Sequence, residues 1–504
     1  MIKKVYLIGA GPGDPGLLTV KAARILGMAD VLVYDRLANP AIIDRYARPD
    51  VERIYAGKAS SQHTLKQGEI NRLLVDKARE GKTVVRLHGG DPFIFGRGGE
   101  EAEELAAAGI PFEIVPGITS AIAAPAYAGV PVTHRSHNTS FAVVTGHEDP
   151  TKTKSTIQWE KLATAAGTLI FLMGMENLEV IVQRLMQYGR AADTPVALIR
   201  WGTWTRQETL VGTLGDIAAK AAASKFQPPV VIVVGSVVSL RSKLRWWDNR
   251  PLYGKRVLVT RSREQASALS ALLAEQGAEP VEIPVLKIVP PDSFNDLDRA
   301  LASLSDYDWV VFTSANGVRI FLERLDALGC DVRALGSARL AAIGPATAQE
   351  LSRCHLKVDV MPDQYIAEKV AEAMISAGVD RMKVLLPRAE MARDVLGEEL
   401  EKAGANVDRV VAYRAVPTHR DLSVLREQLR DGEIDIATFA SSSTVRFLAD
   451  GLGKDAPALL ATTKVACIGP ITANTARELG IRVDIVASEH TIPGLVQALV
   501  ESEE

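Results

Sequence analysis

Cysteine is scarce in this chain. Of 504 residues only Cys330, Cys354 and Cys467 are cysteines, and none forms a C-x-x-C pair. Disulfide scaffolds and cysteine-based zinc sites use closely spaced cysteines, so both classes are excluded. We expect three buried, reduced thiols and a cytoplasmic location. The opening MIKKVYLIGAG agrees, because Gly9 and Gly11 interrupt its apolar stretch before it reaches the length of a signal peptide.

Long hydrophobic runs and an excess of one charge are also lacking. No apolar run approaches the roughly 20 residues that cross a bilayer, which excludes a membrane-spanning protein. The net charge is −3, from 58 basic and 61 acidic residues, so no basic field attracts nucleic acid. A composition with 47% hydrophobic and 24% charged residues is typical of globular α/β proteins. The length predicts about two to four domains.

Short apolar strands alternate with helical stretches in the first half, which predicts α/β layers with a largely parallel sheet. The expected strands are 4–9, 30–34, 83–87, 111–115, 140–145, 168–172, 195–200 and 229–235. The segment 241–256 that follows is polar and basic and contains Pro251 and Gly254, so it is expected to be a domain boundary. Its adjacent Trp246 and Trp247 are expected to pack on a flanking domain.

The second half repeats itself. Segment 255–285 aligns with 382–412, so that Val257 matches Val384 and Gly277 matches Gly404, each 127 residues apart. The Ser-rich FTSANGVR and FASSSTVR segments and the AIGPATA and CIGPITA segments correspond in the same order. Two similar α/β lobes of about 125 residues are the direct prediction of this repeat.

Two glycine-rich turns follow strands in the first half, GAGPGDPG at 9–16 and GGDPFIFGRGGEE at 89–101. A nicotinamide site would require G-x-G-x-x-G, but Asp14 occupies the third glycine position and Pro12 lies inside the turn. Glycines let the backbone approach a ligand closely, so two such turns predict a ligand site. The alternative is that they only form tight turns.

These turns are accompanied by further motifs that carry a family resemblance. The motifs are YDRL at 34–37, VPGITSA at 115–121, PVTHR at 131–135, TGH at 145–147, FLMG at 171–174 and GT at 202–203. Together they resemble the uroporphyrinogen-III C-methyltransferases of the tetrapyrrole methylase family, across residues 1–245. The resemblance implies a two-lobed α/β fold, S-adenosyl-L-methionine as cofactor and a homodimer. The implied cofactor-binding positions are Pro12, Gly89, Gly90, Asp91, Ile94, Thr119, Ser120, Met173 and Gly202.

The resemblance also assigns catalytic roles. Asp35 would accept a proton from the macrocycle and Lys58 would donate one. The alternatives are an N-cap or an ion pair with Arg36 for Asp35, and a solvated surface charge for Lys58. His88 replaces the lysine that is usual in the family's LKGGD, so the charge expected on this substrate side depends on pH.

A substrate rich in carboxylates would need a local basic cluster. Arg97, His134 and Arg135 are the predicted substrate-binding cations, with Arg86 and His88 as looser candidates. The alternative is a set of solvated surface charges.

The second half resembles uroporphyrinogen-III synthase across 246–504, through VLVTR, FTSANGVR, IGPATA, VAYR, FASSSTVR and CIGPITA. The resemblance implies one lobe at 252–286 plus 419–504 and another at 290–412, joined by two short crossings near LKIVP and YRAVP. It also implies that Tyr413 is the acid that assists loss of a hydroxyl; a packed strand tyrosine is the alternative. Ligand candidates, each of which is also explicable as an N-cap, are Ser314, Thr347, Ser441 and Thr472.

The sequence as a whole therefore predicts a bifunctional enzyme of siroheme or cobalamin precursor synthesis. It would cyclise hydroxymethylbilane to uroporphyrinogen III and methylate that product twice to precorrin-2. No metal cluster, nucleic-acid partner or membrane partner is expected. One alternative keeps the methyltransferase but makes the second half a non-catalytic tetrapyrrole-binding module. Another is a methylase acting on a translation factor or ribosomal RNA, which the GRGGEE turn and the lack of basic excess disfavour.

Overall fold

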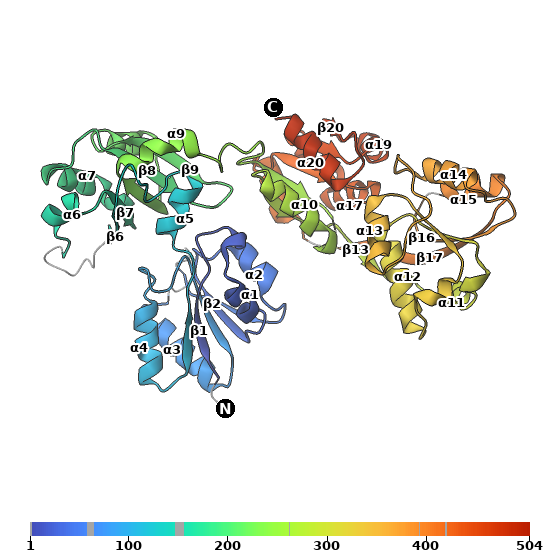
Figure 1. The fold of residues 1–504 in the computed structure, drawn as a ribbon, viewed down its shortest axis with the longest axis horizontal. Coiled ribbons are helices and arrows are strands. Elements are labelled where there is room, and N and C mark those ends of the chain that lie inside the picture. Colours follow the sequence, from blue (N-terminus) through green and yellow to red (C-terminus); the bar gives the residue numbers. More distant parts are fainter. Residues whose placement is uncertain are drawn as a thin grey trace. The chain divides into compact units, whose positions relative to one another are not determined.

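The described part of the chain folds around four five-stranded β-sheets, two in each of its two units (Figure 1). A computed structural model describes residues 3–57, 65–146, 156–261, 263–392, 394–418 and 421–503. The units are Met1–Gly254 and Lys255–Glu504. Helices flank every sheet, so the predicted α/β class is confirmed. Within the described ranges, no helix is both long enough and apolar enough to cross a bilayer.

The first sheet is wholly parallel, in the order β3-β2-β4-β1-β5. Its strands are β1 (Val5–Gly9), β2 (Val31–Tyr34), β3 (Glu52–Tyr55), β4 (Val84–His88) and β5 (Phe112–Val115). Helices α1 (Val20–Leu26) and α2 (Pro40–Tyr46) cover one face, while α3 (Gln67–Arg79) and α4 (Gly98–Ala107) cover the other (Figure 1). Because helices cover both apolar faces of this sheet, a ligand site is expected at the loops that follow the carboxyl ends of its strands.

The second sheet has the order β6-β7-β10-β8-β9 and is mostly antiparallel. Its strands are β6 (Phe141–Thr145), β7 (Thr168–Leu172), β8 (Pro195–Arg200), β9 (Glu208–Thr213) and β10 (Val230–Val234). Only β6 and β7 run parallel, since β8 and β9 form a hairpin and β10 returns antiparallel between β7 and β8. The expectation of a largely parallel sheet is therefore wrong here. The all-apolar strand β10 is central and covered on both faces, and such burial does not reveal strand direction.

The helices around the second sheet complete the first unit. They are α5 (Ser120–Tyr127), α6 (Trp159–Ala165), α7 (Leu178–Gln187), α8 (Ile217–Ala223) and α9 (Arg241–Leu244). Helices α6, α7 and α8 pack on one face and α5 on the other. After α9, the expected docking of the tandem tryptophans is confirmed: Trp246 and Trp247 both pack against Tyr127 of α5.

The second unit contains two sheets with matching strand orders, β12-β11-β18-β19-β20 and β13-β17-β16-β14-β15. The third sheet consists of β11 (Arg256–Val259), β12 (Glu279–Glu282), β18 (Ile436–Phe439), β19 (Lys464–Cys467) and β20 (Ile485–Val486). The fourth consists of β13 (Leu286–Val289), β14 (Trp309–Phe312), β15 (Arg339–Ala342), β16 (Lys383–Ala389) and β17 (Asn406–Pro417). The run β12-β11-β18-β19 thus corresponds to β17-β16-β14-β15.

The repeat read from the sequence matches this correspondence. Val257 lies in β11 and Val384 in β16, while Gly277 and Gly404 make equivalent left-handed turns with φ of 99° and 90°. The helices of this unit are α10 (Arg263–Glu275), α11 (Asn295–Ala302), α12 (Ala315–Ala327), α13 (Pro345–Arg353), α14 (Ala367–Ser376), α15 (Val395–Lys402), α16 (Ser423–Arg430), α17 (Ser442–Leu452), α18 (Ala456–Leu459), α19 (Pro470–Glu478) and α20 (Ile492–Glu501). The similar lobes predicted for the second half are confirmed.

The chain passes between these lobes at two places, which pair with each other. Strand β13 lies antiparallel to the end of β17, with Leu286 opposite Pro417 and Val289 opposite Arg414. These are the LKIVP and YRAVP crossings expected from the sequence. Their backbone hydrogen bonds tie the crossings into one ribbon at the edge of the fourth sheet.

The cysteines depart from expectation. Cys467 is buried in β19, but Cys330 and Cys354 are exposed. Both exposed cysteines follow the ends of helices, α12 and α13, where the chain turns at the surface. The prediction of three buried thiols is therefore wrong for two of them.

Candidate functional site

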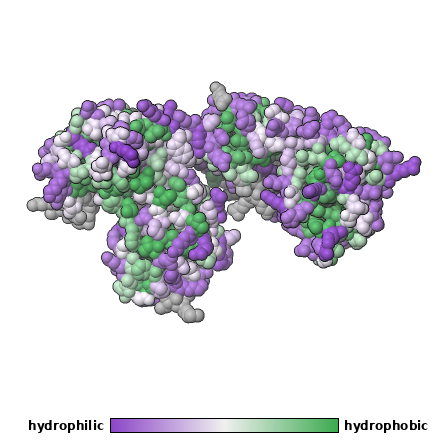
Figure 2. Space-filling model, viewed as in Figure 1, coloured by the Kyte–Doolittle hydropathy of each residue, from purple (hydrophilic) through white to green (hydrophobic). Residues whose placement is uncertain are grey.

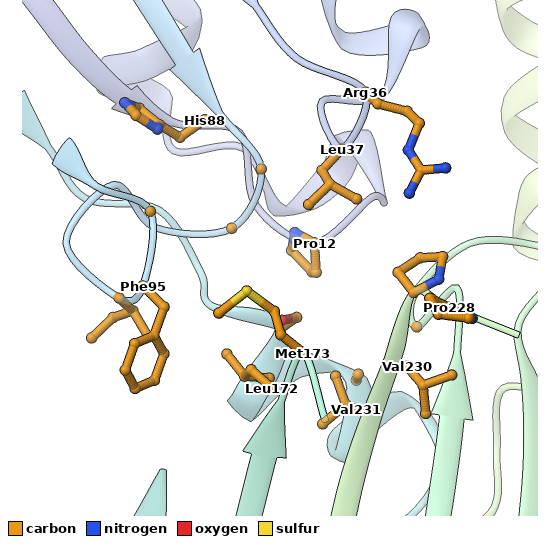
Figure 3. Close-up of a pocket in the computed structure, with 18 of the residues that line it drawn as sticks. Pro12, Arg36, Leu37, His88, Phe95, Leu172, Met173, Pro228, Val230 and Val231 are labelled. Atoms are coloured by element: carbon orange, nitrogen blue, oxygen red, sulfur yellow. The ribbon is translucent and has the colours of Figure 1, made fainter. Parts of the chain in front are cut away.

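A cavity of about 730 Å³ in the first unit is lined by both of its lobes (Figure 3). The first lobe contributes the loops that follow β1, β2 and β4 at the carboxyl edge of the parallel sheet. The second lobe contributes the ends of β7 and β8, the start of β10 and helix α5. Figure 2 shows hydrophobic surface on the first unit where its lobes adjoin. The cavity therefore combines an edge suited to ligand-binding loops with an apolar opposite wall.

The two glycine-rich turns meet at this cavity. Gly11 N–H donates to the Gly90 carbonyl at 3.1 Å, and Gly90 N–H donates to the Gly11 carbonyl at 2.8 Å. Both glycines have positive φ, 76° and 71°, which side chains rarely tolerate. A Cβ at Gly89 would lie 2.4 Å from the Cβ of Leu37. The glycines thus allow the two loops to touch and leave backbone at the cavity surface.

Seven of the nine predicted cofactor positions line the cavity: Pro12, Gly89, Gly90, Ile94, Ser120, Met173 and Gly202. Among the described residues, Asp91 and Thr119 do not belong to the lining. The Asp91 carboxylate accepts from the N–H groups of Phe93 and Gly117, at 2.8 and 3.0 Å. The Thr119 hydroxyl accepts from Ala121 N–H at 3.3 Å and caps α5. Both side chains shape the loops beside the cavity.

The second-lobe wall contains strained backbone. Met173, Trp201 and Thr203 have φ of 55°, 48° and 72°, a region seldom occupied by residues other than glycine. Between the last two, a Cβ on Gly202 would lie 2.3 Å from the Cβ of Ala124. In Figure 3 the Met173 side chain extends into the cavity from the end of β7. Such clusters of strain are typical of ligand sites.

Asp35 follows β2 and lines the cavity with its side chain 26% exposed. Its Oδ1 accepts from Leu37 N–H at 3.0 Å, and its Oδ2 accepts from the Arg86 guanidinium at 3.2 Å. The ion-pair partner considered from the sequence was Arg36, so that alternative is wrong in its partner. Asp35 has one donor on each oxygen, which fixes the carboxylate plane at the cavity edge.

Behind Asp35 lies a buried charge network around Glu101. This carboxylate accepts from His88 Nε2 at 2.8 Å, from Arg86 Nε at 3.2 Å and from Gln67 Nε2 at 3.1 Å. Burial disfavours the charged form of Glu101. The hydrogen bond and charge of His88, with Arg86 and Gln67, outweigh that burial and hold the Glu101 pKa below its ordinary value. Glu101 is thus a buried anion that organises two basic side chains.

Arg86 and His88 were looser candidates for substrate cations. Both belong to the cavity lining, and their side chains are buried and hydrogen-bonded to Glu101. Glu101 itself was missed. A signal existed, because residues 86 and 88 are two apart on a strand and therefore share one face. Two basic side chains on one face of a buried strand require an anion.

Of the three predicted substrate cations, Arg97 lines the cavity and the other two, also among the described residues, do not. Arg97 occupies the N-cap position of α4 with φ of 62° and pairs with Glu100 at 2.6 Å. His134 and Arg135 lie in the turn after α5 and, in the described part of the chain, are not among the cavity residues. The His134 ring packs on His137 with ring centroids 5.0 Å apart. Arg36, which sequence reasoning did not assign to substrate, does line the cavity (Figure 3).

Lys58 and His147 of the TGH motif lie outside the described residues. Within the described ranges, no group of three or more His, Cys, Asp or Glu side chains is arranged to hold a metal ion.

In the second unit the structure brings Tyr413 and Ser314 together. Tyr413 in β17 is buried, and its hydroxyl lies 2.9 Å from the Ser314 hydroxyl. Burial raises the Tyr413 pKa, and the Ser314 hydrogen bond opposes that rise. Ser314 also caps α12 by accepting from Gly317 N–H at 2.9 Å. The N-cap alternative for Ser314 therefore holds alongside its contact with Tyr413.

The other candidates occupy equivalent edge positions. Ser441 caps α17 by accepting from Thr444 N–H at 3.3 Å, beside the third sheet. Thr347 and Thr472 are buried in the first turns of α13 and α19. All four helices start where a parallel strand ends, so their N-terminal N–H groups gather at the carboxyl edges of the two sheets. Such edges suit an anionic ligand.

Comparison with known proteins gives matches to both halves. Residues 4–218 match the tetrapyrrole (corrin/porphyrin) methylases, and residues 267–497 match uroporphyrinogen-III synthase HemD. The chain is 38% identical to the porphyrin biosynthesis protein HemD of Ruminiclostridium josui, over 99% of this chain and 97% of that protein. It is 54% identical to the S-adenosyl-L-methionine-dependent uroporphyrinogen III methyltransferase of Methanosarcina barkeri, over 48% of this chain and 94% of that protein. A crystal structure of uroporphyrin-III C-methyl transferase from Thermus thermophilus complexed with S-adenosyl homocysteine matches with a TM-score of 0.41. The identity there is 38%, over 47% of this chain and 100% of that chain.

Proposed function

Since this chain belongs to the tetrapyrrole methylases through its first half and to the uroporphyrinogen-III synthases through its second, we propose that it catalyses two consecutive steps of tetrapyrrole biosynthesis. The second half cyclises hydroxymethylbilane to uroporphyrinogen III. The first half then methylates that product twice, with S-adenosylmethionine, to precorrin-2 on the way to siroheme or cobalamin. The observation that carries the proposal is the meeting of the two glycine turns, Gly11 to Gly90, at a large cavity.

The activities are assigned to residues 1–245 for methylation and 246–504 for cyclisation, with synthase lobes at 252–286 plus 419–504 and at 290–412. The matched ranges 4–218 and 267–497 support this division. We further propose a cytoplasmic enzyme that forms a homodimer through its first half, acting on tetrapyrroles and not on nucleic acid or membranes. The near-neutral net charge supports that choice of partners.

The cavity suits the adenosyl cofactor, because its loops present backbone groups. A Cβ at Gly89 or Gly202 would collide with a neighbouring residue, and Gly90 has a positive φ that side chains rarely adopt. Because these positions carry no side chains, backbone donors and acceptors remain accessible to a ligand. Pro12, Ile94 and Met173 add apolar contact, and Ser120 starts α5 at the same wall. Asp91 and Thr119 hold these loops in shape. S-adenosylmethionine supplies an already activated methyl group.

The residues of the chain therefore need to orient the acceptor ring, exclude water and take up a proton. Asp35 is the proposed proton acceptor. Leu37 N–H and Arg86 hold its two oxygens, and each oxygen retains a lone pair that is able to take up a proton. Lys58 stays the proposed proton donor. Arg36 and Arg97 line the cavity and suit the carboxylates of a porphyrinogen, while His134 and Arg135 remain candidates for its outer carboxylates.

The synthase chemistry is a loss of hydroxyl followed by ring closure with inversion of the last ring. Tyr413 is the proposed acid. A tyrosine phenol carries its proton at neutral pH, and burial raises the Tyr413 pKa further, so a proton is available for the leaving hydroxyl. Ser314, Thr347, Ser441 and Thr472 stand at helix starts, whose N–H groups are suited to the substrate's carboxylates.

One incubation tests both halves. The full chain is supplied with enzymatically generated hydroxymethylbilane, with and without S-adenosylmethionine, and the products are analysed as porphyrin isomers after oxidation. Type III uroporphyrin without the cofactor, shifting to a dimethylated product with it, is the expected result. Type I isomer alone would reduce the second half to a tetrapyrrole-binding module. Type III isomer with no methylation would contradict the assignment of the first half.

A further inference from the structure

The segment that joins the two units packs tightly on the first unit. Trp247 is only 6% exposed. Its ring lies 4.4 Å from the ring of Tyr127 between centroids, and the Arg250 guanidinium lies 3.4 Å from its centroid. Trp246 reaches the same helix, where its indole N–H donates to the Ala126 carbonyl at 3.1 Å. We call residues 245–254 the connector. Trp247 is buried and Trp246 is half exposed, and both pack on helix α5 of the first unit.

A first path of contacts leads from the connector to the glycine-rich loop 11–16. The indole N–H of Trp247 donates to the Trp204 carbonyl at 3.2 Å. The indole N–H of Trp204 in turn donates to the Pro12 carbonyl at 3.2 Å. A Cβ on Gly13 would lie 2.1 Å from that same indole nitrogen, so the ring and the loop are in direct contact. Trp247 thus supports Trp204, whose ring packs directly against the loop.

A second path runs through Tyr127. The ring of Trp247 packs on the ring of Tyr127, whose hydroxyl donates to the Asp14 carboxylate at 2.8 Å. Asp14 uses its other oxygen to accept from Gly16 N–H at 2.7 Å, which closes the loop. The packing of Trp247 on Tyr127 therefore positions the Tyr127 hydroxyl, which anchors Asp14, the only carboxylate of the loop.

A third path starts at the end of the connector. The Tyr253 hydroxyl donates to the Gln207 carbonyl. The buried Gln207 side chain accepts from Thr203 N–H at 2.8 Å, and the Thr203 hydroxyl accepts from Asp14 N–H at 3.1 Å. Thr203 has a strained φ of 72°, a conformation that persists only where its surroundings determine it. Gln207 provides that support, and Tyr253 positions Gln207.

All three paths end on one side of the cavity. They converge on Pro12 and Asp14 in the loop and pass beside Gly202, while Trp204 itself lines the cavity. We infer that Trp247 is a positioning residue for the adenosyl cofactor, and that the connector fixes the loop-side wall against which the cofactor binds. The inference rests on the proposed methyltransferase function. Because the second unit begins at Lys255, the chain that leads into it is also the support of the cofactor loop.

The test is cofactor affinity in the full chain, measured by calorimetric titration with S-adenosylhomocysteine. We expect Trp247→Ala to raise the Kd at least about tenfold. The loop then loses part of its support and has to become ordered when the ligand binds, which costs binding free energy. Trp247→Phe keeps the ring on Tyr127 but loses the N–H to Trp204, so a loss of about threefold is expected. Tyr253→Phe removes only the third path's hydroxyl and provides a milder variant if Trp247→Ala does not fold.

Trp159→Ala is the matched control, since Trp159 stacks on Phe171 at the face of the second sheet covered by α6, α7 and α8, whereas the connector packs on α5 at the other face. It is expected to lower the melting temperature and leave the Kd unchanged. An unchanged Kd in the folded Trp247 and Tyr253 variants would overturn the inference, as would an equal weakening by Trp159→Ala. A wild-type chain that does not bind S-adenosylhomocysteine would instead overturn the proposed methyltransferase function. Synthase activity, measured in every variant, reports whether the second unit is folded.

Discussion

His88 and Glu101 face each other across 2.8 Å with both residues only 1% exposed. Arg86 and Gln67 complete the surroundings of the Glu101 carboxylate. In a site so fully excluded from water, the network is stable only while every member has its partner. The Arg86 guanidinium also donates to Asp35. Through Arg86, the buried Glu101 therefore helps to position Asp35, the proposed proton acceptor at the cavity edge.

We expect Glu101→Gln to destabilise the first unit by about 3 kcal/mol, because the substitution leaves Arg86 with too little compensating charge. Urea unfolding followed by tryptophan fluorescence measures this, since five of the six tryptophans lie in Met1–Gly254. Glu100→Gln is the control: the neighbouring glutamate pairs with Arg97 at the surface, and a change below about 1 kcal/mol is expected. Equal losses in the two variants would contradict a special role for Glu101.

The same network predicts a pH dependence. The Glu101 pKa is lower in the folded chain than its ordinary value of 4.5, so the folded state binds the proton more weakly than the unfolded state. The stabilisation is therefore complete above that ordinary value and is lost as the pH falls through the native pKa. The difference in unfolding free energy between wild type and Glu101→Gln should shrink as the pH is lowered from 6 toward about 3. A difference that grows on acidification would reverse the assigned direction.

Replacing Asp35 tests the chemical step. Asp35→Asn keeps the shape of the side chain and an acceptor for Leu37 N–H or Arg86, but removes the base. We expect kcat for methylation to fall by about 10² to 10⁴. The affinity for S-adenosylhomocysteine should change less than about twofold, because Asp35 is held by the first lobe's own residues and not by the glycine turns. A fall in affinity with unchanged kcat would assign Asp35 to binding instead.

The sequence predicted those parts of this protein that depend on local pattern. Gly11 and Gly90 predict a close approach between the backbones of two loops. The 127-residue repeat from Val257 to Val384 predicts the paired lobes. Strand β3, Glu52–Tyr55, was missed because it is a polar edge strand without apolar alternation. The spacing of Arg86 and His88 on β4 indicates a buried anion, but Glu101 was missed because it lies on another element, α4, which that spacing does not identify.

The thiols offer a direct test of the correction made for the cysteines. Cys330 and Cys354 are exposed, while burial raises the pKa of Cys467 to about 12. Thiolate is the reactive form, so Cys467 should resist labelling. With a disulfide reagent at pH 8, two thiols per chain should react quickly and the third only in denaturant. Cys467→Ala should leave the fast phase unchanged, and a fast phase of three thiols would show that β19 opens readily.

Tyr413 offers the sharpest test of the second half. Its hydroxyl contacts Ser314 at 2.9 Å, and burial raises its pKa, so Tyr413→Phe removes the proposed acid with little change in packing. We expect type III isomer formation to slow by about 10²-fold, and spontaneous closure then gives type I isomer in its place. Ser314→Ala should have a smaller effect, since the phenol remains. Tyr307→Phe is the matched control, because Tyr307 is a buried tyrosine of the same lobe whose hydroxyl donates to Asp408. That change should alter stability without altering the isomer ratio, and a Tyr413→Phe chain that still makes type III isomer at the wild-type rate would remove Tyr413 from the mechanism.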